Sequence, residues 1–115
     1  MSILQWNCRG LNSNFTDFRL LIDEYNPIVV CLQETFLSSS DFNIRGYKSF
    51  HYLSQDIGGR ACGGASILVR DGNTHSEVKL TTTLQAKAVT ISTSNVCFFC
   101  FFEKIYSNQQ ILYTG

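Results

Sequence analysis

The chain has 115 residues, of which 44% are hydrophobic and 13% aromatic, so it is long enough for one small folded domain and too short for two. Nine Lys and Arg residues balance nine Asp and Glu residues, and this zero net charge argues against a large basic field while leaving room for a local phosphate-contacting groove. Five cysteines without regular spacing, no basic leader and a longest apolar run of seven residues predict an intracellular protein with reduced thiols and no membrane partner.

A strand, a helix and a second strand are predicted for the first third of the chain. Ile3–Cys8 is a short apolar run typical of a buried strand, and the loop at 10–14 contains helix-capping residues. Apolar residues from Phe15 to Tyr25 then recur at helical spacing, and Pro27 marks the end of that helix. Ile28–Leu32 is a continuous apolar run, which is typical of a strand covered on both faces.

Extended runs and turns alternate through the middle of the chain. We predict extended segments, in chain order, at Tyr47–Leu53, Ala65–Val69, Ser76–Leu80 and Lys87–Ser92, the last two continuing an antiparallel meander. We predict a polar loop at Ser38–Asp41, a flexible glycine-rich loop at Gly58–Gly64 and a tight turn at Asp71–Asn73.

The end of the chain follows no such pattern. Val96–Phe102 is rich in Phe and Cys and is an aggregation hazard unless it lies inside a sheet. Residues 103–115 show neither strand nor helix period, and no closing element is evident. We therefore expect a partial domain over residues 1–95 and a divergent C-terminal tail over 96–115.

Asn7 and Glu34 are the strongest candidate site residues. Each follows an apolar strand, and a strand–helix–strand unit would bring the ends of both strands to one cleft. An amide oxygen beside a carboxylate suits a hard cation such as Mg²⁺, which is half of an active site. The alternative for Asn7 is a simple polar residue at a strand end, and Gln33 has either an orienting or a structural role.

Three motifs in order resemble one known superfamily. They are the runs Leu4–Leu11 (LQWNCRGL), Pro27–Thr35 (PIVVCLQET) and Gly63–Arg70 (GGASILVR). Together they resemble the endonuclease/exonuclease/phosphatase superfamily, and most closely the endonuclease domain at the N-terminus of non-LTR retrotransposon polyproteins. The resemblance runs from about Ile3 to about Thr93. It implies an α/β fold, namely the N-terminal half of a two-layered sandwich with mixed, largely antiparallel sheets and the active site at one edge.

The resemblance also implies a chemistry. Asn7 and Glu34 would be catalytic residues at a site for Mg²⁺ or Mn²⁺, which neutralises charge on the phosphate during phosphodiester hydrolysis. The implied partner is DNA, whose nicking primes reverse transcription, and the implied location is the nucleus. Arg9 and Arg60 are candidate contacts to DNA phosphates, with Arg70 a weaker one.

The later motifs of such a domain have no convincing counterpart. They are an Asp-x-Asn pair and a terminal Ser-Asp-His that carries the general base. Asp71-Gly72-Asn73 fits the first pattern but is better explained by a turn. His51 and His75 lack the preceding Ser-Asp, so we assign both a structural role. We therefore expect a truncated endonuclease domain that is inactive as an isolated chain.

Other interpretations stay open. Cys97 and Cys100 have a metal-type spacing but no second pair of ligands, so core packing is favoured. The chain is alternatively a non-enzymatic remnant, a partner-binding module completed by another chain, or a small phosphatase of the same superfamily. An open sheet edge would in addition favour self-association.

Overall fold

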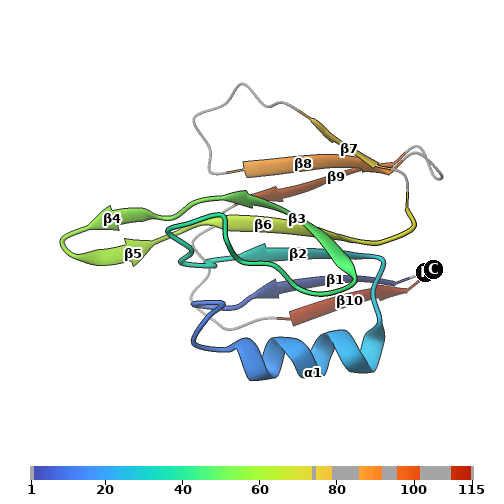
Figure 1. Cartoon of the computed structure of the whole chain (residues 1–115), viewed down its shortest axis with the longest axis horizontal. Helices are drawn as coiled ribbons and strands as arrows, with labels where there is room; N and C mark the ends of the chain where they lie inside the picture. The colour runs from blue at the N-terminus through green and yellow to red at the C-terminus, as the bar shows by residue number, and fades with distance from the viewer. Residues whose placement is uncertain (1, 74, 79–85, 92–95, 102–109, 115) are drawn as a thin grey trace.

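The computed structural model describes residues 2–73, 75–78, 86–91, 96–101 and 110–114. These residues form one helix and ten strands in a mixed α/β arrangement (Figure 1). The elements are β1 (Ser2–Asn7), α1 (Phe15–Tyr25), β2 (Val29–Gln33), β3 (Tyr47–Tyr52), β4 (Gln55–Ile57), β5 (Arg60–Cys62), β6 (Ala65–Arg70), β7 (His75–Val78), β8 (Ala86–Ile91), β9 (Val96–Phe101) and β10 (Gln110–Thr114).

A five-stranded mixed sheet is the centre of the molecule, in the order β10-β1-β2-β6-β3. β1 and β2 are parallel and are joined by α1, while every other pairing in this sheet is antiparallel. The predicted strand–helix–strand unit and the mixed, largely antiparallel sheet are thus confirmed. The parallel pair puts the carboxyl ends of β1 and β2 at the same edge of the sheet.

Both faces of the central sheet are covered. On one face, Val30 and Leu32 of β2 belong to a core cluster with Phe18 and Ile22 of α1. On the other face, Val29 and Cys31 are buried in a second cluster with residues of β6. The three-stranded sheet β7-β8-β9 contacts β2, β6 and β3, so it packs over the central sheet (Figure 1). This double cover explains the continuous apolar run that forms β2.

The ends of α1 show one confirmed prediction and one difference. The helix ends at Tyr25, before Pro27, and the N–H of left-handed Asn26 donates to the carbonyl of Ile22 at 2.8 Å. At the other end, the Asn14 side chain does not cap the helix. Its Nδ2 instead donates to the carbonyls of Cys8 at 2.8 Å and Gly10 at 3.1 Å, so it secures the loop after β1.

The predicted flexible loop at Gly58–Gly64 is wrong. Most of this region is a hairpin of β4 and β5, which projects beyond the main sheets (Figure 1). Gly58 and Gly59 have φ of +61° and +80°, which a two-residue turn between twisted strands requires. Arg60 therefore lies in a strand, paired with Ile57, and not in a loop.

The second half of the chain also differs from the predicted meander. β7 pairs antiparallel with β8, and β8 pairs antiparallel with β9, so the predicted meander forms a separate sheet and does not extend the central one. Leu80 and Ser92, the predicted ends of these strands, lie outside the described residues. The core placement predicted for the Cys97 and Cys100 side chains concerns side chains that the structure does not describe.

A strand near the C-terminus was missed. Gln110–Thr114 forms β10, which pairs antiparallel with β1 along its whole described length. Its sequence does not alternate, so only the backbone pairing with β1 identifies the strand. The domain boundary at residue 95 stays a prediction.

Within the described residues, no helix is long and apolar enough to cross a membrane.

Candidate functional site

The ends of β1 and β2 meet and continue side by side. Asn7 is the register partner of Gln33 in the parallel pair. Beyond the strands, the N–H of Gly10 donates to the carbonyl of Glu34 at 2.7 Å, and the N–H of Leu11 to that of Thr35 at 2.9 Å. The segments that carry Asn7 and Glu34 are therefore joined by backbone hydrogen bonds, at the sheet edge where the sequence predicts that the two strands end together.

The segment after β2 is also held from its other side. The N–H groups of Thr35 and Phe36 donate to the carbonyls of Gly64 at 3.4 Å and Gly63 at 3.0 Å. Gly64 has φ of +93°, and a Cβ there would lie 2.5 Å from the Thr35 hydroxyl oxygen. Gly64 thus has a positional function, because only glycine permits this close approach.

Buried polar atoms without hydrogen-bond partners gather at this junction. Asn7 is only 1% exposed, yet neither its Oδ1 nor its Nδ2 has a partner among the described residues. The same holds for Oε2 of Glu34 and for the hydroxyl of Thr35. Each such group costs about 1–3 kcal/mol when it is left unpaired. The side chains of Asn7, Glu34 and Thr35 thus place three such groups on adjacent segments, which points to a ligand that would satisfy them.

Backbone strain is concentrated in the same two segments. Arg9, Glu34 and Phe36 have φ of +48°, +52° and +56°, in the left-handed region that side chains rarely adopt. Among the described non-glycine residues, the only other case is Asn26, which ends the helix. Strained backbone of this kind is typical of functional sites, where the surrounding hydrogen bonds hold it in place.

The atoms present fit a hard divalent cation. Asn7 supplies an amide oxygen and Glu34 a carboxylate oxygen, and Mg²⁺ binds through one or two protein oxygens while it keeps several waters. Among the described residues, no three or more His, Cys, Asp and Glu side chains lie together in a group that could hold a metal ion. The donor set therefore suits Mg²⁺ or Mn²⁺ better than zinc, which prefers nitrogen and sulfur ligands.

The Cys8 side chain links the segment after β1 to the segment after β2 and has a structural role. Its Sγ donates to the carbonyls of Gln33 at 3.4 Å and Glu34 at 3.7 Å. Burial raises the pKa of the Cys8 thiol to about 12, and the nearby charge of Glu34 acts in the same direction. The thiol is neutral at physiological pH, so it is a poor nucleophile.

Both ring nitrogens of His51 form hydrogen bonds, away from the ends of β1 and β2. Its Nε2 donates to the carbonyl of Phe42 at 3.0 Å, so Nδ1 of the neutral ring accepts the hydroxyl proton of Ser66 at 2.6 Å. Ser66 of β6 pairs with His51 of β3 on one side and with Leu32 of β2 on the other. The Leu32 side chain packs on the α1 face, so the His51 side chain lies on that face too. Asn7 follows Trp6, which is on that α1 face, so alternation directs Asn7 to the opposite face. The geometry supports the structural role predicted for His51.

Asp71 and Asn73 form a turn at the far end of the sheet. Gly72 has φ of +89°, and Nδ2 of Asn73 donates to the carbonyl of Arg70 at 2.9 Å. β6 runs antiparallel to β2, so its Arg70 end lies away from Gln33 and from the candidate site. Arg70 donates to the carbonyl of Asn26 at 2.6 Å and caps the helix end. His75 begins β7, and its side chain lies outside the described part.

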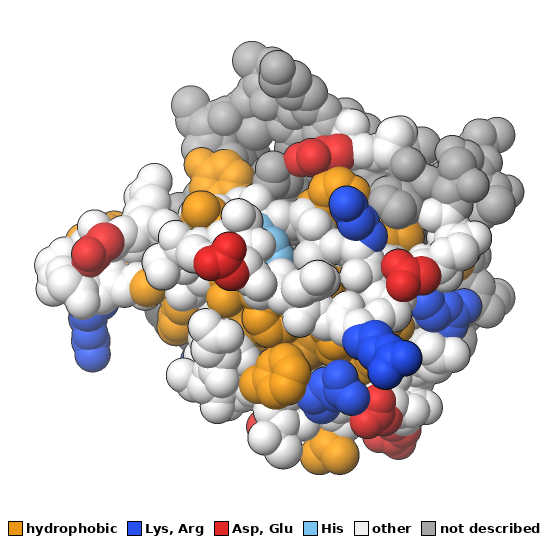
Figure 2. Space-filling model, in the orientation of Figure 1, with side chains coloured by type: hydrophobic (Ala, Val, Ile, Leu, Met, Phe, Trp, Pro, Cys, Tyr) orange, Lys and Arg blue, Asp and Glu red, His pale blue; other side chains and the backbone are white. Residues whose placement is uncertain are grey.

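Arg9 and Arg60 are exposed at the same end as the junction. Arg9 lies in the loop after β1, and Arg60 in the hairpin that enters β6 through Gly63 and Gly64. Acidic and basic side chains are interspersed over the face shown in Figure 2, with no continuous basic patch.

Thr35, whose hydroxyl completes the group of unpaired atoms, was not singled out from sequence, although it ends the second motif.

Comparisons with known proteins relate the chain to one family and one fold. The profile of the Endonuclease/Exonuclease/phosphatase family matches residues 4–102. No curated protein sequence matches the chain. Among solved structures, the catalytic domain of APE2 from Xenopus laevis has a TM-score of 0.53 and 24% identity over 67% of this chain.

Two structures of NExo from Neisseria are also similar. One is described as a 3′ phosphatase bound to a product DNA hairpin and the other as a 3′-5′ exonuclease, with TM-scores of 0.62 and 0.60. Both are 20% identical over 86% of this chain. The chain spans 40% of the length of these structures and 26% of the APE2 structure, so it has a fragment of their fold. The chain belongs to the endonuclease/exonuclease/phosphatase family.

Proposed function

We propose that this chain is the N-terminal part of a DNA endonuclease domain of the non-LTR retrotransposon type, and that Asn7 and Glu34 hold its Mg²⁺ or Mn²⁺. The observation that carries the proposal is the set of buried, unpaired oxygens at the joined ends of β1 and β2. The residues of the motifs at Leu4–Leu11 and Pro27–Thr35 support the retrotransposon branch of the family over a small phosphatase.

Each residue has a distinct role in this proposal. Oδ1 of Asn7 and a carboxylate oxygen of Glu34 bind the cation, while the hydrogen bonds from Gly10 and to Gly64 orient Glu34. The bound cation supplies charge neutralisation on the scissile phosphate. Arg9 and Arg60, both exposed, contact DNA phosphates on either side of the site. The DNA hairpin bound to NExo supports DNA as the partner.

We further propose that the isolated chain does not turn over. Within the described residues, both nitrogens of His51 are engaged on the opposite face, and the Asp71 turn is at the far end of the sheet. Activation of water and binding of the leaving group would thus depend on other parts of a longer domain, and such groups act as a unit. A role in nicking chromosomal DNA would place the protein in the nucleus.

The test combines DNA binding with a plasmid nicking assay. We expect a short DNA duplex to bind in Mg²⁺, and to bind more weakly with EDTA or after Glu34→Ala. We expect supercoiled plasmid to stay intact under all three conditions. Nicking that both controls abolish would contradict the proposed inactivity, whereas binding that neither control weakens would contradict the metal site.

Self-association is a second consequence of the fold. Among the described strands, β3 forms one edge of the central sheet and has no strand beyond it. Exposed edges pair readily with other chains, although charged residues such as the exposed Lys48 of β3 oppose this pairing. We propose weak dimerisation through β3. Light scattering should show a mass that increases with concentration, and a constant monomer mass would contradict this.

A further inference from the structure

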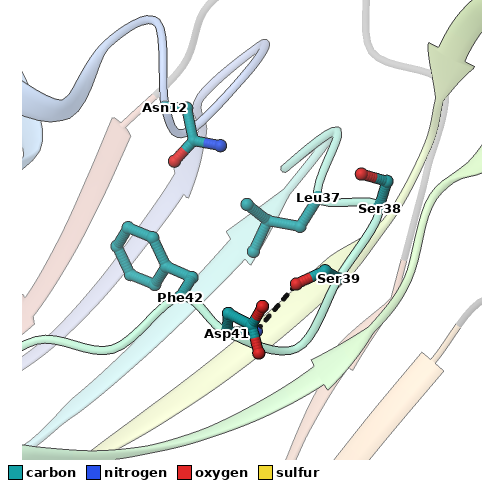
Figure 3. A pocket seen from close by; sticks show the side chains of 6 residues that line it. All are labelled: Asn12, Leu37, Ser38, Ser39, Asp41 and Phe42. Carbon is teal, nitrogen blue, oxygen red and sulfur yellow. Dashed lines mark hydrogen bonds between the residues drawn. The ribbon is translucent and has the colours of Figure 1, made fainter.

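A pocket lies between the loop that follows Asn7 and the loop that follows Glu34. It has a volume of about 300 Å³ and is lined by Asn12, Leu37, Ser38, Ser39, Asp41 and Phe42 (Figure 3). This volume is at the small end of ligand pockets, so it suits one compact group better than an extended chain. The metal chemistry proposed above uses none of these six residues.

The apolar wall of the pocket is fixed in position. The Phe42 ring packs against the rings of Phe15 and Phe18, with centroids 6.0 and 6.1 Å away. The carbonyl of Leu37 accepts the N–H of Ser54 at 2.8 Å and its hydroxyl at 2.9 Å. A preformed wall of this kind lowers the entropy lost on binding a flat ligand.

The polar groups in the pocket define the kind of ligand. The Asp41 carboxylate makes no hydrogen bond or ion pair with the described residues, and Ser39 Oγ accepts the Asp41 N–H at 3.1 Å. Asn12 points its amide toward the pocket from the opposite side (Figure 3). Among the six lining residues there is one carboxylate and no Lys or Arg, so a phosphate would be repelled. A planar group with two adjacent N–H donors matches the two oxygens of the Asp41 carboxylate.

We propose that this pocket binds an unpaired guanine base. Its ring would lie against Phe42, and its N1–H and 2-amino group would donate to the two oxygens of Asp41. Guanine presents two adjacent donors on this edge, whereas adenine and cytosine present a single amino group.

The position of the pocket links it to the proposed DNA site, and this step rests on the proposed function. Leu37 is three residues after Glu34, so their Cα atoms are at most about 11 Å apart. With a rise of about 3.4 Å per nucleotide, the base would lie within about three nucleotides of a phosphate held at Glu34. The pocket would therefore select guanine within about three nucleotides of the cleavage position.

The experiment is an NMR titration of the ¹⁵N-labelled chain with free guanosine. We expect saturable shifts of the Asn12 side-chain amide and of the Ser39 and Asp41 backbone amides. Inosine, which lacks only the 2-amino group, should bind about tenfold more weakly. Asp41→Asn should weaken guanosine binding about tenfold, and Asp23→Asn, which changes an exposed carboxylate on α1, should leave it unchanged.

Equal affinity for guanosine and inosine, or no shift at the pocket residues, would overturn the proposal. Circular dichroism of each variant establishes that it is folded. Guanosine carries no phosphate and needs no metal, so the result is independent of the nuclease proposal. A chain that binds guanosine without any Mg²⁺ response at Glu34 would retain the pocket and lose the metal site.

Discussion

The backbone N–H of Gly10 donates to the carbonyl oxygen of Glu34 at 2.7 Å and joins the loop after β1 to the first residue after β2. On the other side of the same peptide unit, the N–H of Thr35 donates to the carbonyl of Gly64 at 3.4 Å. This unit is therefore bound from both neighbours, which explains how Glu34 is kept at a φ of +52°. The candidate site is built on a rigid backbone.

Gly64→Ala should destabilise the protein more than Gly46→Ala. Both glycines have φ near +90°, so either alanine adds about 1–3 kcal/mol of backbone strain. A Cβ at Gly64 would also lie 2.5 Å from Thr35 Oγ1, whereas nothing lies within 4 Å at Gly46. Overpacking of this kind adds about 1–3 kcal/mol. Urea denaturation measures the two free energies of unfolding, and equal losses would contradict the proposed contact.

Cys8 should resist alkylation in the folded protein. Its thiol is buried and its pKa is raised to about 12, whereas the Cys62 side chain is only half-buried. Peptide mapping after iodoacetamide treatment at pH 8 should show modified Cys62 well before Cys8, and urea should remove the difference. Equal rates of modification in the native protein would contradict the burial of Cys8.

The raised pKa of Cys8 also predicts a loss of stability at high pH. Below pH 9.0, the ordinary pKa of the thiol, Cys8 is protonated in both the folded and unfolded states. Between about pH 9 and 12 the unfolded chain releases this proton first, so the free energy of unfolding falls by up to about 1.4 kcal/mol per pH unit. Urea denaturation at pH 8.5 and 10 should show this fall, and Cys8→Ala should reduce it. An unchanged slope in Cys8→Ala would contradict the prediction.

Ser66→Ala should lower stability without affecting metal binding. The substitution removes the hydroxyl that donates to Nδ1 of His51, at a cost of about 1–3 kcal/mol. His51 lies on the α1 face, away from Asn7, so the increase in melting temperature with Mg²⁺ should equal that of the unmodified chain. A loss of the Mg²⁺ response would place His51 within the metal site and contradict its structural role.

The N-terminal half of the fold could be predicted because its elements carry their own patterns. The apolar run of β2 and the helical spacing of α1 each reflect burial against neighbours. β10 could not be predicted in this way, since its partner β1 lies about a hundred residues away in the sequence. The β4–β5 hairpin was missed because its residues are almost all exposed, and exposed strands lack alternation.

The placement of Asn7 and Glu34 at one sheet edge could be predicted for a similar reason, and their metal-binding role stays a prediction. Asn7 and Glu34 stand where apolar strands end, and parallel pairing alone brings them to one edge. The contributions of Thr35 and Gly64 depend on a contact between segments thirty residues apart, which local patterns do not encode. The positive φ of Glu34 is likewise imposed by hydrogen bonds to two other segments.

The melting temperature of the chain in MgCl₂ or MnCl₂ shows whether Asn7 and Glu34 bind a divalent cation. Saturating metal at about ten times its dissociation constant adds about 1.4 kcal/mol of stability, which is a rise of several degrees. We expect this rise in the unmodified chain and in Glu24→Gln, an exposed control on α1, and its loss in Glu34→Gln. An equal rise in Glu34→Gln, or no saturable rise in the unmodified chain, would contradict metal binding by these residues.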